Sequence, residues 1–169
     1  MKTEKKILDV TCGSRSIWFN KKHPLAIYFD RRDVEYEATF GTIPRTRHAI
    51  IHPDVVGDFT ALPFEDNAFS LVVFDPPHCW GLLNTSWTAK RYGTYDSKEE
   101  MLDNITKGFA ECMRVLKPDG VLVFKWSEIQ IPTPEIIKAI GYQPLFGHHS
   151  GKKSNTNWLC FMKGGIGDA

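Results

Sequence analysis

The sequence lacks several features that would assign a protein to a specialised class. It contains four cysteines but no Cys-x-x-Cys pair and no cluster of cysteine and histidine at the spacing of a zinc site. No stretch approaches the ~18 consecutive apolar residues of a membrane helix. The charged residues 2–6 lead straight into a predicted strand and leave no room for the apolar part of a signal peptide. We therefore expect a cytoplasmic protein with buried, unpaired thiols and no metal.

Net charge is also scarce. The formal charge of the 169 residues is only +1, which gives no strong general attraction to nucleic acid, although local basic patches remain open. A chain of this length fits one domain and buries roughly 70% of its unfolded surface, so it needs no disulfide or metal to fold. Residues 1–163 are predicted to form this domain, and the glycine-rich residues 164–169 are expected to be a disordered tail.

Short apolar runs alternate with helical or irregular stretches along the chain. Residues 31–53 are polar and predicted to be irregular, and Ser97, with Glu100 three residues later, has the pattern of a capping box. This alternation predicts a mostly parallel, seven-stranded α/β sheet with helices on both faces. The predicted strands cover 6–10, 25–29, 54–57, 70–74, 121–126, 145–146 and 158–162; the predicted helices cover 15–22, 97–116 and 134–140; and a polar hairpin covers 150–155.

Acidic residues lie at the ends of the first four predicted strands: Asp9, Asp30, Asp58 and Asp75. One acid after a strand usually caps a helix or forms a turn. Four of them argue for a shared ligand, because ligands of such sheets bind at the carboxyl ends of the strands.

These segments resemble the motifs of class I S-adenosylmethionine (SAM) dependent methyltransferases. Residues 7–14 (Ile-Leu-Asp-Val-Thr-Cys-Gly-Ser) are similar to the first motif of that family, and residues 57–64 are similar to its third. Residues 116–121 (Leu-Lys-Pro-Asp-Gly-Val) resemble the turn that precedes its fifth strand. The resemblance extends from Ile7 to Met162 and implies a Rossmann-like methyltransferase fold with SAM as the cofactor.

The resemblance also implies which residues bind SAM. Asp30 would accept hydrogen bonds from both ribose hydroxyls, and Asp58 would accept one from the adenine amine. The first loop departs from the family pattern, because it has Gly13 in place of two or three glycines. Arg15 pairs either with the methionine carboxylate of SAM or with an acid such as Asp9. The complete set is Asp9, Thr11, Cys12, Gly13, Ser14, Arg15, Asp30, Asp58, Phe59 and Asp75.

The sequence Asp75-Pro76-Pro77-His78 follows a buried strand and resembles the Asp-Pro-Pro-aromatic motif of methyltransferases that act on exocyclic amines of adenine or cytosine. Such an amine is a poor nucleophile, because its lone pair is delocalised into the ring. A carboxylate and the Pro76 carbonyl that accept its two hydrogens would favour a pyramidal nitrogen aimed at the SAM methyl group. His78 departs from the motif: its ring has a smaller stacking face and titrates near neutral pH.

Aromatic and basic residues interleave in the segment 79–96 that follows the motif. This composition suits stacking and phosphate contacts with a nucleic-acid strand, and it also suits an ordinary lid that packs its aromatic side chains on the core. Lys125 and Glu128 either face the site or pair with each other. Arg45, Arg47, His48, Lys152 and Lys153 either extend a basic rim or are simply solvated. The predicted substrate contacts are Trp80, Trp87, Arg91, Tyr92 and Lys125.

The predicted activity is transfer of a methyl group from SAM to an exocyclic amine of a nucleobase, with adenine in DNA favoured over RNA. Asp75, Pro76, Pro77 and His78 form the predicted catalytic centre, and positioning supplies most of the acceleration. Only the segment 79–96 is a candidate recognition element, so a partner subunit that selects the target is a further expectation. Two alternatives remain: a methyltransferase for RNA, protein or a small molecule, and a noncatalytic SAM-fold subunit that supports a partner.

Overall fold

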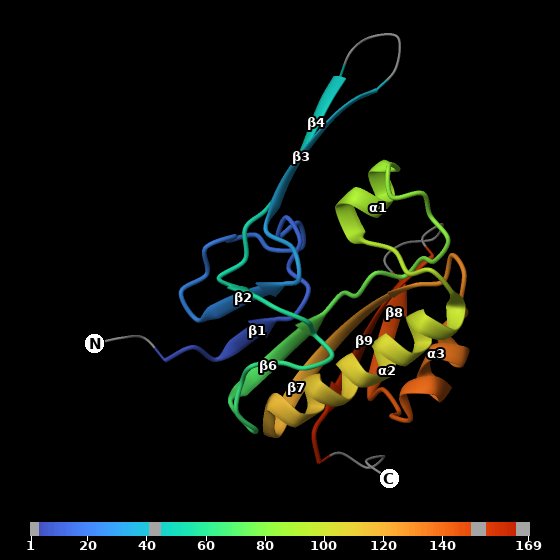
Figure 1. The fold of residues 1–169 in the computed structure, drawn as a ribbon. Coiled ribbons are helices and arrows are strands. Elements are labelled where there is room, and N and C mark those ends of the chain that lie inside the picture. The colour runs from blue at the N-terminus through green and yellow to red at the C-terminus, as the bar shows by residue number, and fades with distance from the viewer. Residues whose placement is uncertain (1–3, 41–44, 150–154, 165–169) are drawn as a thin grey trace.

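The computed structural model describes residues 4–40, 45–149 and 155–164. Its centre is a seven-stranded sheet in the order β5-β2-β1-β6-β7-β9-β8 (Figure 1). β1, β2, β5, β6 and β7 pair in parallel, and β8 and β9 add an antiparallel edge. The predicted mostly parallel, seven-stranded Rossmann-like sheet is confirmed. The strands are β1 (Ile7–Asp9), β2 (Ala26–Asp30), β5 (Val55–Val56), β6 (Phe69–Phe74), β7 (Leu116–Ser127), β8 (Phe146–His149) and β9 (Thr156–Met162).

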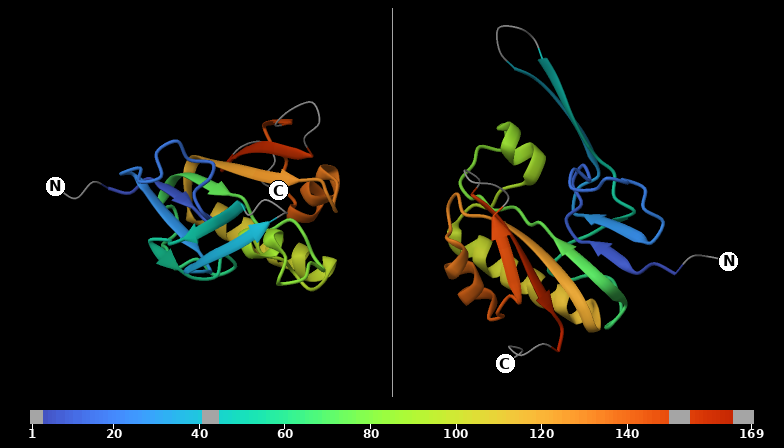
Figure 2. Two further views of the ribbon diagram at one scale, coloured as in Figure 1. Left: turned by 90° about the horizontal axis from the view of Figure 1, so that it is seen from above. Right: turned by 180° about the vertical axis from the view of Figure 1, so that it is seen from behind.

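Two helices, α2 (Lys98–Val115) and α3 (Thr133–Ile140), cover one face of the sheet (Figure 2). The Ser97 side chain caps α2 by accepting a hydrogen bond from the Glu100 backbone N–H at 3.1 Å. The Glu100 carboxylate in turn accepts from the Asp96 N–H, one residue before the position that a standard capping box would use. The apolar stripe of α2 is buried against β6 and β7, and each fully buried large side chain there contributes roughly 1.5–3 kcal/mol.

The opposite face lacks the helix predicted over residues 15–22. Residues 11–25 instead form a series of turns over β1 and β2, with the Trp18 ring packed edge-on against Tyr28 at 5.1 Å between centroids. Gly13 and Arg15 both adopt positive φ, at 48° and 54°, which a helix does not allow. Within the described residues, α2 and α3 therefore lie on one face only, and turns replace the helix expected on the other.

Residues 31–53 are not irregular, as predicted, but contain a two-stranded antiparallel hairpin of β3 (Val34–Phe40) and β4 (Arg45–Ile51). This hairpin, hereafter the arm, projects from the sheet beside the short helix α1 (Trp87–Tyr92) (Figure 1). The sequence carried a signal for it, because apolar and polar residues alternate strictly from Val34 to Phe40. The buried base of the arm, Ala49 and Ile51, anchors it to the domain.

The sequence also led to expectations about the cysteines, membrane helices, metal ligands and the two C-terminal segments. Cys12, Cys79 and Cys112 are buried, Cys160 is half-buried, and all four are unpaired. None of the helices in the described ranges is long and apolar enough to cross a membrane. Within the same ranges, no group of three or more histidine, cysteine or acidic side chains is arranged to hold a metal ion. The hairpin predicted over 150–155 and the tail predicted over 164–169 fall almost wholly outside the described residues.

Candidate functional site

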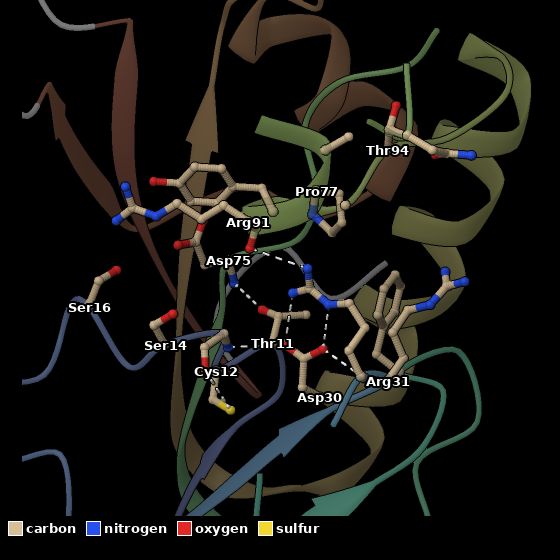
Figure 3. Close-up of a pocket in the computed structure, with 17 residues that line it drawn as sticks. Thr11, Cys12, Ser14, Ser16, Asp30, Arg31, Asp75, Pro77, Arg91 and Thr94 are labelled. Atoms are coloured by element: carbon tan, nitrogen blue, oxygen red, sulfur yellow. Dashed lines mark hydrogen bonds and ion pairs between the residues drawn. The ribbon is translucent and has the colours of Figure 1, made fainter. Parts of the chain in front are cut away.

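A cleft of about 210 Å³ opens where the carboxyl ends of β1, β2 and β6 meet the lid segment that contains α1 (Figure 3). The loop after β1 forms its floor, and the ends of β2 and β6 form two of its walls. The lid closes the cleft on the far side. The lining residues are Thr11, Cys12, Gly13, Ser14, Ser16, Asp30, Arg31, Arg32, Phe59, Asp75, Pro77, Asn84, Ala89, Arg91, Tyr92, Gly93 and Thr94.

The loop after β1 joins the ends of the two neighbouring strands. The Gly13 N–H donates to Asp30 Oδ2 at 3.0 Å, and Thr11 Oγ1 accepts from the Asp75 N–H at 2.9 Å. Gly13 has a left-handed φ of 48°, and no heavy atom lies within 4 Å of the place where a Cβ would stand. Glycine is needed here for its backbone conformation, and the space above it belongs to the cleft.

Asp30 is 3% exposed, and its carboxylate is fully engaged by neighbouring donors. Oδ1 accepts from the Arg32 N–H and Nε, both at 3.0 Å, and Oδ2 accepts from Gly13 and from Arg32 Nη2 at 3.2 Å. A carboxylate offers about four acceptor sites, so none remains for a further donor. Arg32 Nη1 also donates to the carbonyls of Lys90 and Arg91, each at 3.2 Å.

Arg32 therefore connects the acid at the end of β2 to the last turn of α1 in the lid. Arg32 was not among the predicted site residues, although Arg31 and Arg32 directly follow Asp30 in the chain. A basic residue two positions after an acid at a strand end is a weak signal by itself. Only the structure shows that the guanidinium turns back onto that acid.

Asp75 stands at the end of β6, with one carboxylate oxygen held and the other open. Lys125 Nζ donates to Asp75 Oδ2 at 2.6 Å, and the two side chains are only 19% and 13% exposed. Asp75 Oδ1 makes no hydrogen bond within the described part of the chain. Lys125 thus pairs with Asp75, whereas Glu128 accepts a hydrogen bond from the Thr133 N–H at 2.9 Å. The Lys125 ammonium also lies 5.7 Å from the Trp158 ring centroid.

The other residues of the Asp-Pro-Pro-His sequence divide between the cleft and the core behind it. Pro77 lines the cleft, whereas His78 lies behind it, with its ring centroid 5.9 Å from that of Tyr92 and 6.4 Å from that of Trp126. Burial lowers the pKa of His78 below its usual 6.5 and Lys125 adds to this, while Asp75 and a hydrogen bond to the Pro76 backbone oppose it. Because proline has no N–H, this bond uses the Pro76 carbonyl. A neutral His78 thus supports the wall of the cleft.

Asp9 lies beneath the β1 loop and outside the lining of the cleft. It is 1% exposed; Trp18 Nε1 donates to its Oδ2 at 2.6 Å, and its Oδ1 has no hydrogen-bond partner among the described residues. Burial, helped by the charges of Asp75 and Asp30, raises the pKa of Asp9 to about 7, against the lowering effect of the hydrogen bonds from Trp18 and the Thr11 backbone. Asp9 therefore supports the loop from outside the lining of the cleft.

Two further residues predicted to bind the cofactor, Asp58 and Arg15, also lie outside the lining of the cleft. Asp58 is exposed, and its Oδ1 accepts from the Thr60 N–H and Oγ1, both at 2.8 Å, so that the carboxylate closes its own turn. Phe59 takes the place on the cleft wall. The side chain of Arg15 donates to the Lys21 and His52 carbonyls, and its ion-pair partner is Asp54 at 3.6 Å rather than Asp9.

The residues of the lid segment, 79–96, divide between the hydrophobic core and the cleft. Trp80 packs against the hydrophobic core, as an ordinary lid residue would. Arg91 and Tyr92, at the end of α1, line the cleft. Ser86 caps the start of α1 by accepting from the Ala89 N–H at 3.2 Å, and Gly93, with a φ of 89°, ends the helix. Trp87 instead faces a second groove that adjoins the cleft.

No protein-family model matches the sequence, and no curated protein matches it either. The fold is similar to that of the PH0226 protein from Pyrococcus horikoshii (14% identity over 96% of this chain and 84% of the other, TM-score 0.58). It is also similar to a TehB-like SAM-dependent methyltransferase from Corynebacterium glutamicum (16% identity, 95% and 80%, TM-score 0.55). The [4+2]-cyclase SpnF is comparably similar (11% identity, 94% and 74%, TM-score 0.54). The chain therefore has the class I SAM-dependent methyltransferase fold, and the cyclase is a reminder that function depends on the site.

Proposed function

We propose that the protein transfers a methyl group from SAM to an exocyclic amine of a nucleobase, with adenine in DNA as the first candidate. One observation supports this proposal above all. Asp75, the acid of the Asp-Pro-Pro-His sequence, lies on the same cleft as the Gly13 turn and Asp30, and one of its oxygens is open. An acceptor group and the elements of a nucleotide-type cofactor site therefore share one enclosed space.

The residues of the cleft fit SAM in their chemistry. The Gly13 turn leaves open space above the backbone, Asp30 is an acid suited to a ribose diol, and Phe59 offers an apolar wall. The cleft of about 210 Å³ is smaller than the roughly 300–1,000 Å³ of typical cofactor sites. Arg32 lines the cleft, and its guanidinium occupies the Asp30 oxygens that a ribose would need. In the proposal, Arg32 swings away from Asp30 when the cofactor enters.

Asp75 would orient the acceptor amine. SAM supplies an electrophilic methyl group when it is bound. Asp75 Oδ1 accepts one amine hydrogen, while Lys125 holds Oδ2 and fixes the plane of the carboxylate. In the proposal, the Pro76 carbonyl accepts the second hydrogen; Pro76 is buried beside Asp75 and Pro77, outside the lining of the cleft, and its backbone interacts with His78. These two acceptors draw the nitrogen lone pair out of conjugation, and the lid excludes water from the reacting groups.

The ion pair of Asp75 with Lys125 also bears on the alternative of a noncatalytic subunit. Both side chains are largely buried, and burying two charges costs free energy that a purely structural role would avoid with apolar side chains. The position of this pair, with Asp75 on the wall of the cleft, favours a chemical role for Asp75. RNA, protein and small-molecule acceptors remain the alternatives within the same chemistry.

Methyl transfer from tritium-labelled SAM to separate pools of DNA, RNA and protein tests this proposal. We expect label in nucleic acid, and loss of that label in Asp75→Asn, which keeps the shape of the side chain and removes its charge. Label confined to protein would refute the nucleobase assignment. SAM binding without transfer to any pool would favour the noncatalytic subunit.

A further inference from the structure

A second groove, of about 410 Å³, runs between the arm and α1 and adjoins the cleft. The two cavities share Ser14, Ser16 and Arg91, so that the groove leads directly toward the site of the proposed reaction. His48 and Ala49 of β4 line one part of it, and Trp87 and Arg91 of α1 line another. The lining residues are Ser14, Ser16, Lys21, His48, Ala49, Trp87 and Arg91.

The permanent charges of this groove are cationic and lack acidic partners. Among the described residues, neither Lys21 nor Arg91 has a carboxylate within ion-pair distance, in contrast to Arg15 and Arg114 elsewhere on the surface. The Arg91 guanidinium instead lies 4.9 Å from the Tyr92 ring centroid. Two unpaired cations in one concavity on a chain of net charge +1 concentrate positive potential at this place.

We propose that this arm–helix groove binds the sugar-phosphate backbone of the nucleic-acid strand whose base enters the cleft, an inference that rests on the proposed function. Lys21 and Arg91 contact phosphates, and the hydroxyls of Ser14 and Ser16 add hydrogen bonds at the boundary of the two cavities. The Trp87 indole provides an aromatic surface for a flanking base. Cations next to an aromatic side chain are the arrangement that proteins use to hold single strands.

The arm makes a polymer a better match than a small anion. It projects away from the sheet and past α1 (Figure 1). A free phosphate or nucleotide would occupy only the boundary between the cavities, whereas a strand lies along the whole groove. The base contacts in the cleft and the phosphate contacts in the groove then divide the tasks of chemistry and positioning.

Fluorescence anisotropy with a labelled 20-nucleotide DNA strand, the same RNA strand and the DNA duplex tests the groove through salt titrations. Lys21→Ala is the test variant, and Lys22→Ala is its matched control, because Lys22 is the next residue, is exposed and lies outside the groove. Loss of one phosphate contact lowers the slope of log K against log salt by about 0.7 for single strands and about 0.9 for duplex. If the variant and the wild type bind equally at 1 M salt, a slope change of about 0.7 makes the variant bind about fivefold more weakly than the wild type at 0.1 M salt.

We expect this change for Lys21→Ala and none for Lys22→Ala, and the three probes show which nucleic acid the groove prefers. Equal effects of the two variants, or no effect of either, would overturn the proposal. Binding is measured without methyl transfer, so the two proposals fail separately. Lys21-dependent binding without transfer on any nucleic acid would refute only the proposed reaction, and transfer with binding insensitive to Lys21 would refute only the groove.

Discussion

Replacing Arg32 with alanine should tighten SAM binding. In the structure, the Arg32 side chain supplies two of the hydrogen bonds on the buried Asp30 carboxylate, through Nε at 3.0 Å and Nη2 at 3.2 Å. The backbone N–H donors of Gly13 and Arg32 supply the other two and remain in the variant. A ribose diol needs the two acceptor sites that the guanidinium occupies, so cofactor and Arg32 compete for Asp30.

The magnitude follows from this competition. Hydrogen bonds to charged groups contribute about 1.5–3 kcal/mol net, so removal of the competing guanidinium should tighten binding by roughly 10- to 100-fold. In the wild-type background, Asp30→Ala should weaken SAM binding by less than about 10-fold, because the competing Arg32 bonds are lost together with the bonds to the ribose. In the Arg32→Ala background it should weaken binding by the full range.

Calorimetric titration of SAM into the wild type, both single variants and the double variant gives the complete cycle. Urea unfolding of the same four proteins shows whether each is folded before its affinity is compared. Weaker SAM binding by a folded Arg32→Ala protein would show that the guanidinium binds the cofactor itself, and would refute the competition. An Asp30→Ala effect that is identical in both backgrounds would refute it equally.

Three further substitutions test other contacts. Lys125→Met should slow methyl transfer by roughly 10- to 100-fold with little change in SAM affinity, because it removes a charged hydrogen bond to Asp75. In single-turnover experiments, Lys125→Arg should retain part of the rate that Lys125→Met loses. The pKa of Asp9 rises from 3.8 in the unfolded chain to about 7 in the folded protein, so between these values the folded state holds a proton that the unfolded state has lost. Thermal unfolding of the wild type from pH 4 to 8 should therefore show stability falling as the pH rises. Asp9→Asn should show no such fall. Gly108→Ala should lower the free energy of unfolding in urea by about 1–3 kcal/mol and weaken SAM binding, because the new Cβ would stand 2.4 Å from the Phe59 ring that lines the cleft. An unchanged stability and SAM affinity would contradict that packing.

The sheet was predictable because its strands are short apolar runs with clear ends. Asp75 and two prolines end β6, and the Ser97 cap fixes the start of α2 within one residue of its prediction. The helix predicted over 15–22 failed for a local reason: the positive φ values at Gly13 and Arg15 and the hydrogen bond from Trp18 to Asp9 hold the segment in turns. Such a preference depends on a tertiary partner and is not visible in a pattern of apolar residues.

The candidate site was predictable at the level of strand ends and not at the level of side chains. Gly13, Asp30 and Asp75 meet because the carboxyl ends of parallel strands share one edge. The same rule placed Asp58 in the site, but its carboxylate bonds Thr60 instead, a local turn that competes with any ligand. The bond from Arg32 to Asp30 could not be predicted, because a long side chain can reach several acceptors.

Mass spectrometry of nucleosides from DNA and RNA of cells that express either the wild type or Asp75→Ala is the most direct test of the proposed reaction. The proposal predicts a base methylated on its exocyclic amine with the wild type and its absence with Asp75→Ala. Calorimetry on the purified variant should show nearly unchanged SAM affinity, because Asp75 acts on the acceptor. Absence of any such base with the wild type, or the same amount with Asp75→Ala, would contradict the role assigned to Asp75.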